Sequence, residues 1–281
     1  TKKIVNTIFN NEHDLSSQQI HETTSKKEKI LFYPGGFKNN GITTALINLL
    51  DNIDYEKYDI TLIATINKNS EFLNNIQKLN DKVRLVFKIG RVNQTLFEDY
   101  RNYITKQRGL RNKFLKTIHP DKMYKREFQR IFGKTNFDYI IDYSGYSMFW
   151  ANLLLSGKAK KKIIFMHSDL YSDMHKVING RRPHFINLRG VFSLYPYFDE
   201  LISVSEATMK LNKDNLKDYI QNTKIDYVNN AISPNKIIHL SQDDSDVFYK
   251  NDKPYLVSIR KYNNQADLVY TPFPESGDNT I

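Results

Sequence analysis

Short apolar runs alternate with segments that have the spacing of amphipathic helices over much of the chain. Residues 29–33 form the first such run, followed by Pro34-Gly35-Gly36 and then by helical spacing over residues 42–50. This pattern predicts a buried strand, a turn and a helix. Further strands are expected at 60–65, 83–87, 139–142, 163–166 and 201–204, and further helices at 71–79, 148–155, 187–195 and 206–219. The alternation predicts an α/β fold with a Rossmann-like, mostly parallel sheet and helices on both faces.

The two ends of the chain break this alternation. Residues 1–28 are polar and predict a tail or a short hairpin. In the segment 242–281, a polar linker precedes two apolar runs on either side of Asn263-Asn264, which predicts a small β-hairpin. We therefore expect one Rossmann-like domain over residues 29–241 with a short segment at each end. The sequence contains no internal repeat.

The composition is that of a globular protein. The chain has 281 residues, of which 40% are hydrophobic and 13% aromatic, enough to bury a core and too apolar for a disordered chain. The absence of cysteine excludes disulfides, zinc ribbons, iron–sulfur ligation and thiol catalysis. No apolar run approaches the roughly 20 residues of a membrane span, and no signal segment opens the sequence. We expect a cytoplasmic protein, peripheral at the inner face of the membrane. Because the sequence begins with Thr1, we also expect a processed chain or a piece of a longer one.

The positive charge is concentrated in one segment. The formal net charge is +10, and residues 101–131 contain ten Lys or Arg and two Asp or Glu, a net charge of +8. Leu110, Phe114 and Ile118 recur every fourth residue, which predicts a basic amphipathic helix within an insert over residues 94–132. An ordinary solvated helix face is the alternative.

The concentration of charge favours an anionic partner, either a membrane surface or a polyanion. Nucleic acid is the rival partner, but the segment has no recognisable nucleic-acid-binding motif, so we do not expect it. The candidate membrane or polyanion face consists of Arg108, Arg111, Lys113, Lys116, Lys122, Lys125 and Arg126.

The loop after the first predicted strand is a candidate anion site. Ligands of open parallel sheets bind beyond the carboxyl ends of the strands. The segment Pro34 to Gly41 joins a strand to a helix there, so its backbone N–H groups and the helix N-terminus suit a phosphate. It matches neither a P-loop nor a dinucleotide fingerprint, and a bare tight turn is the alternative. We expect no cofactor and no metal ion.

Two later strand-end loops carry groups that suit a sugar. Ser144 and Tyr146, on either side of Gly145, offer hydroxyl groups for a sugar or a polyol. His167 and Asp169 follow the strand at 163–166, where an imidazole and a carboxylate can share one small site. A structural histidine is the alternative.

Two weaker signals complete the series of loops. Ser205-Glu206 begins a predicted helix, and helix capping by Ser205 is the simpler explanation of these residues. The segment 228–234 reads as a strand end and a turn, and is weak by itself.

Taken in order, the five loops resemble the N-terminal half of GT-B glycosyltransferases. The likeness is carried by Tyr33-Pro34-Gly35-Gly36 with Asn40-Gly41, Phe137 to Gly145, Phe165 to Asp169, Phe198 to Ala207, and Asn229-Asn230-Ala231-Ile232. The chain is most similar to the family 4 type of Gram-positive teichoic acid and polysaccharide synthesis, which includes long proteins with CDP-glycerol glycerophosphotransferase activity. The likeness covers residues 29–240. One departure is Asn-Asn-Gly-Ile at residues 39–42, where Gly-Gly-Ala-Glu is more usual.

The resemblance implies an acceptor domain that faces a nucleotide-binding domain across a cleft. The residues it implies are Gly35, Gly36, Asn39, Asn40 and Gly41 near the donor diphosphate, His167 near the reacting sugar, and Ser144, Gly145, Tyr146, Ser205 and Glu206 on the acceptor side. With the strand-end position of Asp169, this makes His167 and Asp169 the candidate catalytic residues. The implied activity is sugar transfer from a nucleotide-activated donor to a teichoic-acid-like or lipid-linked acceptor. A CDP-glycerol-type polyol phosphate transferase and a non-catalytic anion- or membrane-binding adaptor are the alternatives. The resemblance also implies a donor-binding domain after residue 281, so we expect the chain alone to be inactive.

Overall fold

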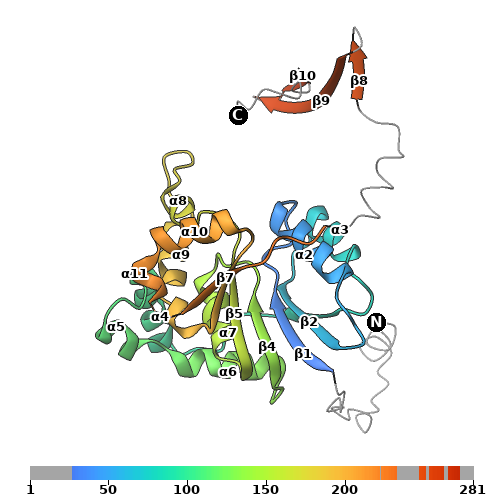
Figure 1. Ribbon diagram of the computed structural model, residues 1–281. Coiled ribbons are helices and arrows are strands. Elements are labelled where there is room, and N and C mark those ends of the chain that lie inside the picture. Colours follow the sequence, from blue (N-terminus) through green and yellow to red (C-terminus); the bar gives the residue numbers. More distant parts are fainter. Residues whose placement is uncertain (1–26, 222, 233–246, 251–252, 263–264, 273–281) are drawn as a thin grey trace. The chain divides into compact units, whose positions relative to one another are not determined.

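The computed structural model describes residues 27–221, 223–232, 247–250, 253–262 and 265–272 (Figure 1). The chain divides into two compact units between Asn230 and Ala231, and each unit is described by itself. Residues 1–26 of the polar N-terminal segment and residues 242–246 of the expected linker lie outside the described residues.

The first unit is built on a parallel sheet with the strand order β3-β2-β1-β4-β5-β6-β7. The strands are β1 (Glu28–Tyr33), β2 (Tyr58–Thr65), β3 (Arg84–Lys88), β4 (Phe137–Asp142), β5 (Ala159–Met166), β6 (Glu200–Ser203) and β7 (Lys224–Tyr227). Every neighbouring pair is parallel. The six predicted strands are therefore present, and β7, which was not among them, extends the sheet beyond β6.

Helices follow the strands as the alternation predicts. They are α2 (Gly41–Asp51), α3 (Ser70–Gln77), α4 (Leu96–Arg108), α5 (Lys113–Ile118), α6 (Asp121–Phe132), α7 (Met148–Leu155), α8 (Leu170–His175), α9 (Phe185–Phe192), α10 (Glu206–Asn215) and α11 (Lys217–Ile220), with a 3₁₀ turn η2 (Tyr195–Tyr197). The helix expected at 206–219 is divided at Leu216 into α10 and α11. The helix α8 was not predicted.

Both faces of the sheet are covered, which confirms the Rossmann-like α/β fold. Ile30 and Phe32 of β1 pack in the cluster that contains the α2 and α3 side chains, whereas Leu31 and Tyr33 pack with those of α6 and α7. Figure 1 shows β1 in the interior of the sheet, between β2 and β4. Because successive side chains of β1 enter opposite cores, the strand reads as a continuous apolar run without alternation.

The insert between β3 and β4 differs from the prediction of one basic amphipathic helix. It contains three helices, because Gly109 ends α4 with a φ of 68° and Pro120 separates α5 from α6. Leu110 is buried in the connection before α5, but Phe114 is 67% exposed. The prediction was therefore wrong: the interruption at Gly109 changes the buried face, and Leu115 is the buried residue of α5.

The second unit contains an antiparallel sheet of three strands in the described residues. Its strands are β8 (Val247–Lys250), β9 (Lys253–Tyr262) and β10 (Gln265–Pro272), in the order β10-β9-β8. Tyr262 pairs with Gln265 at the end of the hairpin formed by β9 and β10. The predicted hairpin is therefore confirmed, and β8 is an additional strand on its edge.

Candidate functional site

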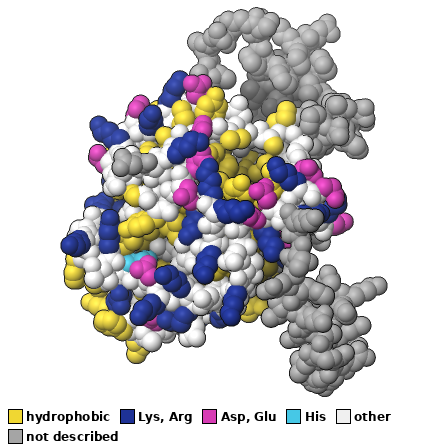
Figure 2. Space-filling view, turned by 60° about the horizontal axis from the view of Figure 1, so that its bottom comes forward, with side chains coloured by type: hydrophobic (Ala, Val, Ile, Leu, Met, Phe, Trp, Pro, Cys, Tyr) yellow, Lys and Arg dark blue, Asp and Glu magenta, His cyan; other side chains and the backbone are white. Residues whose placement is uncertain are grey.

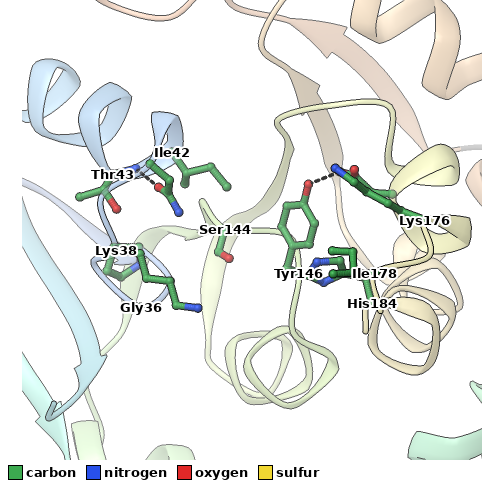
Figure 3. A pocket seen from close by; sticks show the side chains of 13 residues that line it. Gly36, Lys38, Ile42, Thr43, Ser144, Tyr146, Lys176, Ile178 and His184 are labelled. Atoms are coloured by element: carbon green, nitrogen blue, oxygen red, sulfur yellow. Dashed lines mark hydrogen bonds between the residues drawn. The ribbon is translucent and has the colours of Figure 1, made fainter. Parts of the chain in front are cut away.

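A pocket of about 380 Å³ lies at the carboxyl ends of β1 and β4. These two strands are neighbours in the sheet, and the chain leaves β1 toward β2 on one side and returns to β4 on the other. Such a switch point of a doubly wound sheet is where ligands bind. The pocket is lined by Pro34, Gly35, Gly36, Lys38, Asn40, Ile42, Thr43, Ser144, Tyr146, Asp173, Lys176, Ile178 and His184. Figure 3 shows Lys38 and Thr43 on one side, Tyr146, Lys176 and His184 on the other, and Ser144 between them.

The loop after β1 forms the first wall of the pocket. Gly35 has a φ of 88°, and a Cβ atom there would lie 3.2 Å from Ser144 Oγ, so the loops after β1 and β4 touch at this point. Asn40 begins α2 as its N-cap and accepts a hydrogen bond from the Thr43 N–H at 3.0 Å. The positive end of α2 and the Lys38 side chain therefore lie at the same wall.

The structure brings only part of the predicted phosphate loop to the pocket. Gly35, Gly36 and Asn40 line it. Asn39 instead contacts α3: its N–H donates to the Glu71 carboxylate, and its side-chain oxygen accepts from Asn75 Nδ2 at 2.9 Å. Gly41 is the first residue of α2 and is not among the lining residues.

The loop after β4 forms the floor of the pocket, and Ser144 and Tyr146 are among the lining residues, while their role in acceptor binding stays a prediction. Gly145 has a φ of 72°, and a Cβ atom there would lie 2.2 Å from the Phe165 carbonyl oxygen. Only glycine fits this close approach of two strand-end loops. Glycine here lets the chain turn sharply enough to bring both neighbouring hydroxyl groups to the pocket.

A cluster of hydrogen bonds centred on Asp173 forms the second wall. The Tyr146 hydroxyl donates to Asp173 Oδ2 at 2.5 Å and lies 2.8 Å from Ser168 Oγ, which also donates to Asp173 Oδ2. Burial raises the pKa of Tyr146, and the hydrogen bond to Asp173 acts in the same direction, so the phenol stays protonated. Sequence reasoning missed Asp173, Lys176 and His184, because the segment after β5 has no clear period.

His167 lies next to this site but is not among the lining residues. Its Nε2 is 2.5 Å from the Tyr143 carbonyl oxygen, an acceptor, so this nitrogen carries the hydrogen. The ring packs against Tyr143 and Phe165, with centroids 4.7 and 5.9 Å apart. Burial lowers the pKa of His167, which keeps the imidazole neutral. The histidine therefore supports the loop that contains Ser144.

Asp169 caps a helix. Its carboxylate accepts hydrogen bonds from the Ser172 N–H at 3.1 Å and the Ser172 hydroxyl at 2.6 Å, at the start of α8. Burial alone would raise the pKa of Asp169, but the hydrogen bonds from Ser172 outweigh it and lower the pKa. Asp169 does not line the pocket. Neither predicted catalytic residue thus faces the cavity, and their catalytic role stays a prediction.

Ser205 and Glu206 lie at the start of α10, away from the lining residues. Ser205 Oγ accepts from the Thr208 N–H at 3.2 Å as the N-cap, and Glu206 pairs with Lys210 at 2.8 Å. These contacts are those of helix capping and of an exposed ion pair. Their role in acceptor binding stays a prediction.

Asp142 is a fully buried carboxyl group beneath the pocket floor. Its Oδ1 accepts from the Gly145 N–H at 2.9 Å, whereas Oδ2 has no hydrogen-bond partner in the described part of the chain. Burial raises the pKa of Asp142 to about 7. The Asp142 carboxyl group therefore holds the turn that presents Ser144 and Tyr146. Because it is buried, this carboxyl group ionises less readily than an exposed one.

The charge in the pocket suits an anion. Two lysines, Lys38 and Lys176, line it with one carboxylate, Asp173, and the N-terminus of α2 adds positive potential. No group of three or more His, Cys, Asp or Glu side chains within the described ranges is placed to hold a metal ion.

The residues of the predicted basic face are exposed on the insert helices and on the connection before α5. Arg126 pairs with Glu98 at 2.7 Å and also donates to the Asn93 carbonyl oxygen, and Arg111 donates to the Tyr219 hydroxyl at 3.4 Å. Arg101, also counted in the basic segment, donates to the carbonyl oxygens of Ile118 and His119 at the end of α5. Part of the positive charge therefore holds the insert together rather than facing a partner.

Comparisons with known proteins find only distant structural likeness. No family model and no curated protein matches the sequence. Solved structures that are similar include UGT2 of Phytolacca americana in its apo form, with 10% identity, a TM-score of 0.41, and coverage of 78% of this chain and 56% of that one. The same protein complexed with UDP-2-fluoro-glucose and pterostilbene has 12% identity, a TM-score of 0.43, and coverage of 78% and 55%. UGT71G1 of Medicago truncatula complexed with UDP-glucose has 14% identity, a TM-score of 0.38, and coverage of 75% and 52%.

The chain thus spans about half the length of these structures. At these TM-scores the likeness carries no argument about function. None of the helices in the described residues has the length and apolar character needed to cross a bilayer.

Proposed function

We propose that this chain is the acceptor-side domain of a glycosyltransferase, which moves a sugar from a nucleotide-activated donor to a teichoic-acid-like or lipid-linked acceptor. The observation that carries the proposal is the pocket at the switch point between β1 and β4. One wall offers a glycine loop and a helix N-terminus, and the other offers hydroxyl and carboxylate groups. These are the groups that a phosphate and a sugar require.

The donor diphosphate would lie against the wall formed by the loop after β1. Gly36 leaves the backbone open to a close approach, Lys38 supplies a cation, and the first turn of α2 points its N–H groups toward the same wall. Developing charge on a leaving diphosphate is stabilised by such fixed donors.

The sugar hydroxyls would lie near Ser144 and Tyr146. The Tyr146 hydroxyl is held by Asp173 and Ser168, so its orientation is fixed before any ligand binds. His184 lies edge-on to the Tyr146 ring, with centroids 5.5 Å apart, and closes the site on that side. Preorganised polar groups of this kind favour one orientation of a sugar.

The proposal is tested by an enzyme assay of the natural-length protein, meaning the whole protein that contains this domain. The assay offers a panel of UDP-sugars and CDP-glycerol as donors. Consumption of one nucleotide-sugar supports the proposal, and consumption of CDP-glycerol alone favours the polyol phosphate transferase. An absence of turnover with every donor contradicts both. His167→Ala should lower turnover if the histidine acts through the Tyr143 carbonyl, and unchanged turnover would remove His167 from the catalytic candidates.

Docking of the insert on an anionic membrane belongs to the same proposal. Four apolar or aromatic side chains of α4 and one of α5 are exposed: Leu96 92%, Phe97 68%, Tyr100 63%, Tyr103 62% and Phe114 67%. The same two helices also contain the exposed cations Lys106, Arg108 and Lys113. Aromatic rings beside Lys and Arg are typical of protein surfaces that bind the interface of anionic membranes.

Vesicle co-sedimentation tests the docking step. We expect binding to vesicles that contain phosphatidylglycerol, weaker binding at high salt, and little binding to phosphatidylcholine alone. Replacing Leu96 and Phe97 by Ser should weaken binding, whereas Leu73→Ser, at a side chain 48% exposed on α3, serves as the matched control. Equal binding to neutral and anionic vesicles would refute electrostatic docking.

A further inference from the structure

A second pocket, of about 290 Å³, lies toward the amino ends of the strands. The helix α7 begins after the carboxyl end of β4 and returns along the sheet, so its last residues lie near the start of β5. Leu155 and Ser156 at the end of α7 line the second pocket together with Lys162 of β5 and residues of α5 and α6. The two pockets share no lining residue.

Three lysines converge on this second pocket: Lys116 of α5, Lys125 of α6 and Lys162 of β5. Lys162 donates to the Leu155 carbonyl oxygen at 2.6 Å, which fixes its ammonium group at the end of α7. Burial lowers the pKa of Lys162; Asp199 opposes this effect, and the nearby Lys125 adds to it. Lys125 and Lys162 are therefore close enough to repel one another, and a bound anion would relieve that repulsion.

Asp121 is the one carboxylate among the residues that line the second pocket. Its Oδ1 lies 3.8 Å from His119 Nε2, and its side chain is 68% exposed. Figure 2 shows Lys and Arg side chains spread over the face turned toward the viewer, which is the lower side of Figure 1. Among the residues that line the second pocket, three lysines thus stand against one carboxylate.

Two buried polar atoms of the same pocket have no hydrogen-bond partner within the described residues. They are Nδ1 of His119 and Nδ2 of Asn152, in residues that are 7% and 4% exposed. Burial lowers the pKa of His119, while Asp121 and the nearby Asn152 oppose this effect. An amide N–H that is buried without an acceptor costs about 1–3 kcal/mol. Both atoms lie beneath the surface of the pocket rather than on it.

We propose that the second pocket binds a phosphate ester. Its phosphate oxygens accept from the ammonium groups of Lys116, Lys125 and Lys162, which all line the pocket. The organic part packs on Leu155, Leu194 and the Tyr197 ring, over which Lys116 Nζ lies at 5.8 Å from the centroid. The ester is either a soluble phosphorylated metabolite or the headgroup of an anionic lipid, since both present the same phosphate. Binding of the ester at the second pocket does not require the transfer reaction that we propose for the first pocket.

The test is calorimetric titration of the whole chain with glycerol 3-phosphate at low ionic strength. The test variant is Lys116→Gln/Lys125→Gln, and the control is Lys113→Gln/Lys122→Gln. The control makes the same charge change at exposed positions of the same two helices, and its residues do not line the pocket. We expect the test variant to bind about ten-fold more weakly or worse, because it loses two charge-assisted contacts, and the control to bind within about two-fold of wild type.

Vesicles that contain phosphatidylglycerol distinguish the two sources of phosphate. Binding of free glycerol 3-phosphate that is weakened in the test variant supports a soluble ester as the source. Binding of the vesicles alone, with the test variant losing clearly more of it than the control, whose lysines belong to the candidate membrane face, indicates the headgroup. Equal weakening in the test and control variants would show general charge attraction and overturn the site. No difference between wild type and the test variant in either arm would overturn it as well.

Discussion

Replacing Asp142 by Asn should make the stability of the protein less dependent on pH. The carboxyl group is fully buried, and burial raises its pKa from 3.8 to about 7. Between these values the folded protein holds a proton that the unfolded chain has released. Because the folded state binds more protons, stability is greatest below the unfolded pKa and is lost as pH rises through the folded pKa.

The size of this loss follows from the shift. Three pKa units correspond to about 4 kcal/mol over the whole window, since each unit is worth about 1.4 kcal/mol. Of this, about 2.5 kcal/mol should be lost between about pH 5 and about pH 8, because the unfolded carboxyl is already ionised at the lower pH. Asn keeps an oxygen that accepts from the Gly145 N–H and carries no charge, so the variant should not show this loss.

Denaturant unfolding of both proteins at the two pH values measures the difference. His119 and His167, whose pKa values are lowered, change stability in the opposite direction, but they contribute equally to wild type and variant. The comparison between the proteins therefore isolates Asp142. If the free energy of unfolding changes with pH by the same amount in both proteins, then Asp142 is ionised in the folded state and the reasoning fails.

Two further substitutions test the pocket itself. Gly145→Ala should lower the free energy of unfolding by about 3 kcal/mol or more, because its Cβ would meet the Phe165 carbonyl, whereas Gly180→Ala, with the same φ of 72° and no atom within 4 Å, should cost only about 1 kcal/mol. Equal losses in thermal or denaturant unfolding would show that the contact is relieved. Tyr146→Phe should lower kcat/KM of the natural-length protein about ten-fold while changing stability by about 1 kcal/mol, and Tyr171→Phe on α8 is the control. Unchanged kcat/KM in the Tyr146 variant would remove its hydroxyl from the site.

Much of the fold could be predicted because the strands are buried on both faces. The runs of β1, β4 and β5 are apolar at successive positions that enter different cores, so each is visible without alternation. The predicted strands also place Gly35 and Gly145 in the loops that follow them. The insert could not be predicted from periodicity, because Gly109 divides it and shifts the buried face of α5 from Phe114 to Leu115.

The candidate site could be predicted only as far as its edge of the sheet. Because His167 directly follows β5, the sequence places it at the carboxyl edge of the sheet, where the pocket lies. The sequence does not show whether its ring faces the cavity or packs beneath a neighbouring loop. The ring lies against Tyr143, and Asp169 is used as a helix cap. Asp173 reaches the pocket from α8, a helix of six residues. A helix this short does not produce a recognisable repeat of apolar residues in the sequence.

Sugar transfer by the natural-length protein is the most direct test of the proposed function. The assay follows release of the nucleotide from a panel of UDP-sugars and CDP-glycerol in the presence of a teichoic-acid-like or lipid-linked acceptor. Our account predicts that one nucleotide-sugar is consumed with transfer to the acceptor, and that Tyr146→Phe slows that transfer. Neither transfer nor hydrolysis with any member of the panel would contradict the account.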